Sequence, residues 1–381
     1  MYKQAYFISL LVLCKNIIGG IAVKYALIGC GMISPNHIKA ALENDLEIVA
    51  LCDLVDDNRN KALELIPEEQ RAEVTLYENH LEMLDKEKPE LVAIALGSGL
   101  KRRLSVDCMK AGANVIVEKP IALSLDDADV MIKTAEECGV KLIVNHQLRF
   151  GKTVRALKAE SQTGKFGKLL HGTVQVRRNR NKAYFDAGKW RGTWANDGGT
   201  LMNQCIHYTD LLQWIMRSDV DEVFAYTDRM THAYIEAEDL GLAVLKFKNG
   251  AYATIEGTVN TYPKNLSDSM AVFGETGTVS LRGKELDDVE AWDFAEGPQN
   301  RDEAINYFDI EDMGAGHAPL YKYAVSVING QDDDICPATD SRKALELILA
   351  IYRSAAEGKP VKLPLEKCAT TDFAGRFDKH Q

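Results

Sequence analysis

Short apolar runs alternate with amphipathic stretches over the first third of the chain. The runs are β-branched or aliphatic, as in strands buried on both faces, and they cover residues 23–28, 48–52, 91–96, 115–117 and 142–144. Helical patterns separate them, at roughly 57–66, 78–86, 101–111 and 125–138. A further helix opens with Ser34 as the expected capping residue and Pro35 at the first helical position. This alternation predicts an α/β domain over 23–144, built on a doubly wound parallel sheet.

After about residue 145 the expected strands become longer and alternate between apolar and polar positions. They cover 170–178, 240–248, 251–259, 270–273 and 278–281. Asn249 and Gly250 form a strong hairpin signal between two of them. Helices are expected at 204–216 and 341–357. We therefore predict an α+β domain over 145–381 with a large, mostly antiparallel open sheet.

Composition and charge exclude several classes of protein. The formal net charge is −11, whereas a general nucleic-acid binder is normally basic. The eight cysteines form no CxxC pair, so neither a metal site nor a disulfide framework is expected, and we predict a cytoplasmic protein with reduced thiols. Residues 1–22 are interpreted as a non-catalytic extension. Their apolar run, 5–13, is shorter than the roughly 20 residues that span a bilayer, so no membrane span is expected.

A glycine-rich turn follows the first expected strand. The turn, residues 29–34 (GCGMIS), opens the first helix, where Gly29 permits the tight bend and Gly31 lets backbone N–H groups approach a pyrophosphate. Asp53 ends the second strand, 24 residues after Gly29, where a carboxylate accepts hydrogen bonds from a ribose and repels a 2′-phosphate. The pattern predicts NAD as the cofactor, in contact with the turn residues Gly29, Gly31, Met32 and Ile33 and with Asp53.

Two further motifs carry a resemblance to a known family. Glu118-Lys119-Pro120 follows the fifth strand, and residues 197–210 read DGGTLMNQCIHYTD. Together with the glycine turn, they resemble the Gfo/Idh/MocA oxidoreductases over residues 23–365. The resemblance implies that Glu118, Lys119 and Ser98 lie by the cofactor. The chain departs from the family where threonine-proline usually precedes Ser98, and where histidine often replaces Lys101.

A narrower resemblance concerns the substrate. Residues 189–194 (KWRGTW), 202–204 (MNQ) and 261–265 (TYPKN) look like the UDP-N-acetylglucosaminuronate 3-dehydrogenases. Those enzymes oxidise the sugar 3-hydroxyl of a UDP-linked acetamido uronic acid to a ketone, in the biosynthesis of surface polysaccharides. The resemblance implies a nucleotide-sugar substrate, and it places Trp194 among the substrate-binding residues.

Alcohol oxidation needs a hydride acceptor, a base and a group that stabilises the developing alkoxide. Lys119 suits the last role because it follows a strand end, at the crevice where doubly wound folds bind ligands. Asn203 and His207 are four residues apart, so an α-helix would place them on one face. His207 can act as the base and Asn203 can orient the hydroxyl. Many polyol dehydrogenases of this family carry aspartate where Asn203 stands, so neutral Lys119 remains an alternative base.

A local basic cluster points to an anionic ligand. Residues 177–191 hold six basic side chains and one acid within an acidic chain. Arginine forks bind diphosphates and carboxylates, so Arg178, Arg180 and Arg191 are expected to bind the substrate, with Arg149 at the domain junction as a further candidate. The other expected substrate-binding residues are Trp194, Asn203, His207 and His317, the last beside Gly316 after a loop-like stretch. The same cluster is also compatible with a solvated strand or a subunit contact, because sheets of this family often pair, and a homo-oligomer (dimer or tetramer) is expected.

Two alternative functions remain open from the sequence. One is another substrate within the family: inositol, a simple aldose or other polyol, or a trans-dihydrodiol. The other is an NAD-binding regulator without enzymatic activity. Because the chain retains both Lys119 and His207, an enzyme is favoured.

Overall fold

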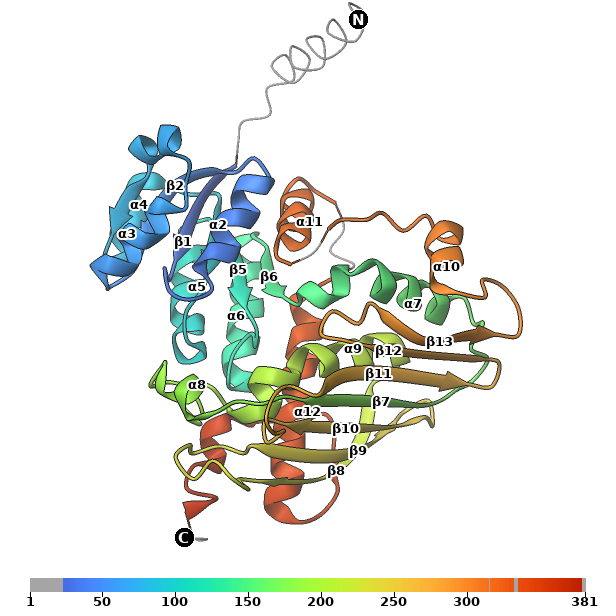
Figure 1. The fold of residues 1–381 in the computed structure, drawn as a ribbon. Coiled ribbons are helices and arrows are strands. Elements are labelled where there is room, and N and C mark those ends of the chain that lie inside the picture. Colours follow the sequence, from blue (N-terminus) through green and yellow to red (C-terminus); the bar gives the residue numbers. More distant parts are fainter. Residues whose placement is uncertain (1–22, 315, 332–334, 379–381) are drawn as a thin grey trace, which may run out of the picture.

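The computed structural model describes residues 23–314, 316–331 and 335–378, so the predicted extension over 1–22 lies outside the described residues. Six parallel strands form the first sheet, in the order β3-β2-β1-β4-β5-β6 (Figure 1). The strands are β1 (Lys24–Ile28), β2 (Glu47–Cys52), β3 (Thr75–Tyr77), β4 (Leu91–Ile94), β5 (Asn114–Glu118) and β6 (Leu142–Asn145). The predicted doubly wound sheet is confirmed, and only the three-residue edge strand β3 was not foreseen.

Helices connect these parallel strands. They are α2 (Ser34–Glu43), α3 (Asp56–Glu64), α4 (His80–Glu87), α5 (Lys101–Lys110) and α6 (Leu125–Cys138), with short helices η1 (Glu68–Glu73) and η2 (Ser98–Leu100). The predicted capping role of Ser34 is wrong. Ile33 is the N-cap residue, and the Ser34 hydroxyl instead donates to the Gly31 carbonyl at 2.7 Å. The helix therefore starts directly from the glycine turn, one residue earlier than the capping pattern predicted.

The second sheet has eight strands in the order β13-β12-β11-β7-β10-β9-β8-β14. They are β7 (Leu169–Arg177), β8 (Val220–Asp228), β9 (Leu240–Phe247), β10 (Tyr252–Thr258), β11 (Ser267–Gly274), β12 (Gly277–Arg282), β13 (Asp288–Phe294) and β14 (Val361–Lys362). All neighbours are antiparallel except β7 and β10, which run parallel. The mostly antiparallel sheet is thus confirmed, including the hairpin at Asn249 and Gly250.

Helices cover one face of the second sheet, and the other face is open (Figure 1). The remaining helices are η3 (Gln147–Phe150), α7 (Lys152–Gln162), α8 (Lys182–Asp186), η4 (Leu201–Cys205), α9 (Ile206–Met216), α10 (Arg301–Tyr307), α11 (Ala318–Ile328), α12 (Ala338–Glu357) and η5 (Thr370–Phe373). Among these, α9 packs on β7, and α12 packs on β8. The alternating burial along β9 follows from this one-sided cover.

Two helices from the second half join the two sheets. Figure 1 shows α11 beside α2, and Leu320 and Tyr321 are buried in one core with Tyr25 and Ile38. The hydroxyls of Tyr25 and Tyr321 lie 2.9 Å apart. Helix α12 packs against α6 and β6 as well as against the second sheet. Residues far beyond position 145 therefore complete the core of the first half of the molecule.

In the part of the chain that the structure describes, no helix is both long enough and apolar enough to cross a membrane.

Candidate active site

A cleft of about 640 Å³ lies at the carboxyl edge of the first sheet, where β1, β2, β4 and β5 end. This is the edge at which doubly wound folds bind ligands. Its lining from the first half includes the predicted residues Gly31, Met32, Ile33, Asp53, Ser98, Glu118 and Lys119. From the second half it includes the predicted residues Arg191 and Asn203. The fold therefore brings the cofactor residues together with part of the expected substrate site.

The glycine turn has the shape that a dinucleotide requires. Gly29 has φ +97°, and a Cβ there would lie 2.6 Å from the Ala95 carbonyl oxygen, so another side chain would clash. A Cβ at Gly31 would meet nothing within 4 Å, which leaves the backbone open to a ligand. The Asp53 carboxylate accepts from the backbone N–H groups of Cys30 and Val55, each at 2.8 Å. The turn and the end of β2 are thereby fixed to each other, and their residues fit an NAD cofactor.

Arg59 lies directly behind Asp53, and the sequence analysis did not single it out. Its guanidinium donates to the Asp53 carbonyl and to the Asp56 carboxylate, the latter at 2.8 Å. An arginine at this place in a dinucleotide fold is a potential partner for a 2′-phosphate. The Asp53 carboxylate and the Arg59 guanidinium thus lie close together at the end of β2, where the ribose of the cofactor is expected.

Lys119 is partly buried where the two halves meet at the cleft. Its Nζ donates to the Asn203 carbonyl at 2.6 Å. Burial lowers the pKa of Lys119, and the nearby Glu118 and Asp197 carboxylates oppose that shift. An ammonium group in this position can stabilise an alkoxide.

Asn203 is held by a carboxylate that the sequence analysis did not assign. Its side-chain amide donates to Asp197, and the Gly192 N–H donates to the same carboxylate at 2.7 Å. Asparagine at position 203 brings no charge of its own, but Asp197 places one directly against it. Because Asp197 also acts on the pKa of Lys119, it belongs to the electrostatic environment of the site.

Asn203 lies in a π-helical turn, η4, and α9 begins only at Ile206. The predicted α-helical spacing between Asn203 and His207 is therefore wrong, since the wider turn interrupts it. His207 is 9% exposed, and its ring lies edge-on to His146 with centroids 5.5 Å apart. Burial and the Lys119 charge hold the pKa of His207 well below its usual value, so its imidazole is neutral at pH 7. A neutral imidazole is the form that can accept a proton.

His317 lies behind Glu118 and is not among the residues that line the cleft. Its Nε2 lies 3.0 Å from Glu118 Oε1, the same oxygen to which the Asn145 amide donates at 2.6 Å. The predicted proximity of His317 to the site thus comes through Glu118. His37 also approaches this oxygen, at 3.1 Å.

Only some of the basic cluster faces the cleft. Arg191 lines it, donates to the Tyr184 carbonyl at 2.6 Å and lies over the Tyr184 ring. Arg180 lines a small adjoining cavity that also includes Asn203, and it donates to Gln204 Oε1 at 2.8 Å. Arg178 is committed to Asp268, with Nη2 2.7 Å from the carboxylate. The cluster therefore divides into arginines that line the cleft or the adjoining cavity, Arg191 and Arg180, and one that is paired with a carboxylate, Arg178.

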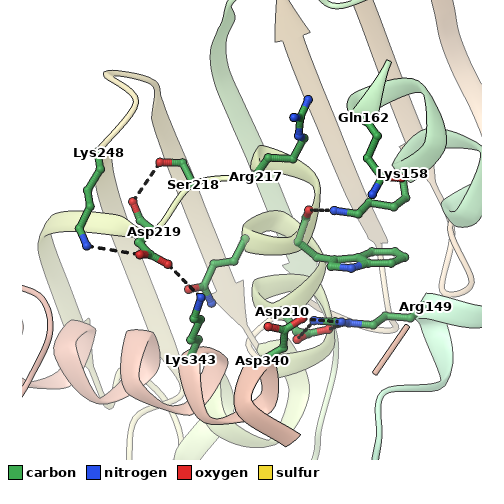
Figure 2. A pocket seen from close by; sticks show the side chains of 12 residues that line it. Arg149, Lys158, Gln162, Asp210, Arg217, Ser218, Asp219, Lys248, Asp340 and Lys343 are labelled. Atoms are coloured by element: carbon green, nitrogen blue, oxygen red, sulfur yellow. Dashed lines mark hydrogen bonds and ion pairs between the residues drawn. The ribbon is translucent and has the colours of Figure 1, made fainter. Parts of the chain in front are cut away.

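Arg149 and Trp194 lie away from the cleft. Arg149 makes two 2.7 Å bonds to Asp210 and one of 2.9 Å to Asp340, beside a separate pocket of about 560 Å³ (Figure 2). Trp194 is 1% exposed, and its ring packs against Tyr352, Phe373 and Phe377. The structure brings neither together with the other predicted substrate residues, because each is buried among core partners.

Known proteins resemble this chain in sequence and in fold. Residues 23–146 match an oxidoreductase family with an NAD-binding Rossmann fold, and residues 154–280 match the GFO/IDH/MocA C-terminal domain. The WlbA dehydrogenase from Chromobacterium violaceum, crystallised with NADH and UDP-GlcNAcA, is 34% identical with a TM-score of 0.83, over 92% of this chain and 98% of that one. Its counterpart from Bordetella pertussis, crystallised with the same ligands, is 33% identical with a TM-score of 0.82, over 91% and 98%.

Among curated relatives, D-apiose dehydrogenase from Paraburkholderia graminis is 27% identical over 350 residues, which is 89% of each chain. The family matches cover both halves of the molecule, and each brings its own part of the cleft: the glycine turn and Lys119 from the first, Arg191 and Asn203 from the second. The chain belongs to the Gfo/Idh/MocA family and is an NAD-dependent oxidoreductase that acts on CH–OH groups.

Proposed function

We propose that the chain oxidises the sugar 3-hydroxyl of UDP-N-acetylglucosaminuronate to the 3-keto sugar, in the biosynthesis of surface polysaccharide sugars. One observation carries the proposal: the partly buried Lys119 side chain shares a single cleft with the glycine turn and with a guanidinium, Arg191. Alcohol oxidation requires the first two, and an anionic nucleotide sugar requires the third. The likeness to two WlbA dehydrogenases that bind UDP-GlcNAcA supports the same substrate.

Two residues that line the cleft, Lys119 and Asn203, and one that is not among its lining residues, His207, divide the work of oxidation. Bound NAD supplies the hydride acceptor. Lys119 stabilises the oxygen as its proton leaves, and Asn203, fixed by Asp197, orients the hydroxyl. His207 accepts the proton in its neutral form, with neutral Lys119 as the alternative base. The secondary alcohol thus loses a hydride from its carbon to NAD and a proton from its oxygen to the base, and the product is a ketone.

Arg191 and Arg180 are the arginines that we assign to the anionic groups of the substrate. Arg191 lines the main cleft, and Arg180 lines the cavity that adjoins it at Asn203. Arg178 supports Arg180 indirectly. It pairs with Asp268 and donates to the Gln204 side-chain oxygen, which also accepts a hydrogen bond from Arg180. Arginine forks in these positions suit a diphosphate and a carboxylate.

A second candidate is the oxidation of a simple aldose or polyol, which the likeness to D-apiose dehydrogenase favours. Such a substrate carries no phosphate and would leave Arg191 without an anion. The two candidates therefore differ in their dependence on this residue.

The test is NADH formation by the purified chain with UDP-N-acetylglucosaminuronate, D-apiose or myo-inositol, and detection of the 3-keto product by mass. We expect oxidation of the UDP sugar and a loss of about 100-fold or more in turnover for Lys119→Ala, with NADH binding retained. Lys110→Ala, an exposed lysine, is the control. Faster oxidation of D-apiose or myo-inositol than of the UDP sugar would overturn the assignment.

We also propose that the open face of the second sheet mediates self-association into a dimer or tetramer. Large apolar side chains on β8, β9 and β10 are exposed by 45% to 68%: Tyr226, Leu242, Val244 and Tyr252. A contiguous apolar patch on a sheet marks an interaction surface. Sedimentation analysis is the measurement, and a strictly monomeric chain at micromolar concentration would contradict the proposal.

A further inference from the structure

Three metal-ligating side chains meet at the end of β5, beside the cofactor cleft. His37 comes from α2, Glu118 ends β5, and His317 immediately precedes α11. The Nε2 atoms of His37 and His317 lie 3.1 Å and 3.0 Å from the same oxygen, Glu118 Oε1. All three atoms lie within 4.8 Å of one another. Segments distant in the sequence therefore bring two imidazole nitrogens and one carboxylate oxygen to a common point.

The buried Nε2 of His37 lies against the Glu118 carboxylate without a well-formed hydrogen bond. The His37 side chain is fully buried, and Nε2 lies 3.1 Å from Glu118 Oε1, close enough for an ion pair but outside hydrogen-bond geometry. Buried polar atoms normally have a partner, because leaving one unpaired costs its full desolvation. An ion between the three side chains would be such a partner.

The surroundings orient these side chains as outer-shell groups orient metal ligands. The other ring nitrogen of His37, Nδ1, lies 2.7 Å from the Tyr321 hydroxyl, which is paired with Tyr25. If Nδ1 carries the proton and donates to Tyr321, the lone pair of Nε2 is free for a cation. Asn145 donates to Glu118 Oε1 at 2.6 Å and fixes the carboxylate.

The spacing of the donor atoms also suits an ion. Two ligands at about 2.1 Å from a divalent cation lie about 3.0 Å apart at the right angle of octahedral coordination and about 3.4 Å apart at the tetrahedral angle that zinc prefers. The two measured separations from Glu118 Oε1, 3.1 Å and 3.0 Å, match the octahedral value and are shorter than the tetrahedral one. Two histidines and one carboxylate on one side of an ion leave its other positions open.

We propose that His37, Glu118 and His317 form a binding site for a divalent transition-metal cation of the zinc type. Glu118 also lines the cofactor cleft, so the open positions of the ion are accessible to water or a ligand oxygen. Three protein ligands with open positions are typical of a catalytic or regulatory ion, whereas a structural zinc site is closed by four. This site does not depend on the identity of the sugar substrate.

The test measures zinc binding directly. The full chain without an affinity tag is stripped with a chelator and titrated with Zn²⁺ against a chromophoric competitor, in the absence of NAD and sugar. We expect one ion per chain, and a loss of affinity of at least about 10-fold for His37→Gln and for His317→Gln. Tyr321→Phe, which keeps the ring and removes the partner of Nδ1, should also weaken zinc binding by about 10-fold.

His171→Gln is the matched control, because His171 lies on β7 and stacks on Phe273, outside the triad. NADH binding by each variant shows that its fold is retained. No zinc binding by the wild-type chain would overturn the proposal, and so would equal affinity in His37→Gln and wild type. Equal losses in His171→Gln and His37→Gln would assign the zinc to surface histidines and would equally refute the site. If the histidine variants do not fold, the wild-type stoichiometry and Tyr321→Phe still decide.

Discussion

Replacing Lys101 by methionine should change how the stability of the protein depends on pH. Lys101 begins α5, is 1% exposed and donates from Nζ to the Pro120 carbonyl at 2.7 Å. Burial lowers the pKa of Lys101 from 10.5 to about 7, with Glu118 opposing the shift and Lys119 adding to it. The folded protein therefore binds the Lys101 proton far more weakly than the unfolded chain does.

The size of the effect follows from proton linkage. Wherever the unfolded chain binds more protons, stability rises with pH, which for Lys101 is the range from about pH 7 to 10.5. With folded and unfolded pKa values of about 7 and 10.5, the buried lysine destabilises the fold by about 4 kcal/mol at pH 7 and about 2 kcal/mol at pH 9. Lys101→Met removes this cost and loses one hydrogen bond, worth about 1 kcal/mol. The variant should therefore be about 3 kcal/mol more stable than wild type at pH 7.

Urea unfolding at pH 7 and pH 9 measures the difference. From pH 7 to pH 9, the free energy of unfolding of wild type should rise by about 2 kcal/mol relative to that of Lys101→Met. Other groups titrate equally in both proteins and cancel in this comparison. Lys110→Met, an exposed lysine at the end of the same helix, should follow wild type. If wild type and Lys101→Met depend on pH in the same way, the burial of a charged lysine at this position is refuted.

Two other substitutions test the placement of predicted site residues. Asp53→Ala should weaken NAD binding and raise the ratio of kcat/KM for NADP over NAD by at least about 10-fold, because Arg59 then faces a 2′-phosphate unopposed. An unchanged ratio in steady-state kinetics would show that Asp53 does not contact the ribose. Arg149→Met leaves Asp210 and Asp340 without their partner and should lower the free energy of unfolding by about 3–5 kcal/mol, with the KM for the sugar unchanged. Unaltered stability together with a raised KM would instead make Arg149 a substrate ligand.

The elements that the sequence predicted are those whose pattern is complete within a few residues. Buried strands such as β1 and β2 read directly from their apolar runs, and the β9–β10 hairpin from Asn249 and Gly250. Helix α11 was missed because its apolar residues pack against α2 and against the first sheet, far away in the sequence. The π-helical turn η4 was read as part of a regular helix, since the register of its hydrogen bonds has no local sequence signal.

The predicted site divides in the same way. The glycine turn and Lys119 were found because a strand end followed by a turn fixes both backbone and side-chain position locally. Arg149 shows where such reasoning fails: its carboxylate partners lie 61 and 191 positions away, and only the fold could bring them together. Three other features were not foreseen for the same reason: the contact of buried Lys101 with the Pro120 carbonyl, the hydrogen bond from Asn203 to Asp197, and the proximity of His37 to His317.

The sequence by itself determined the alternation of strands and helices in the first half, the glycine turn and the presence of a lysine at a strand end, because these depend on neighbouring residues. The tertiary structure decided which charges face the ligand and which serve the core. Arg191 lines the cleft, whereas Arg178 and Arg149 form ion pairs with buried carboxylates. The sequence alone does not distinguish these three arginines. A buried charge must find an opposite charge, and the fold alone determines which one it meets.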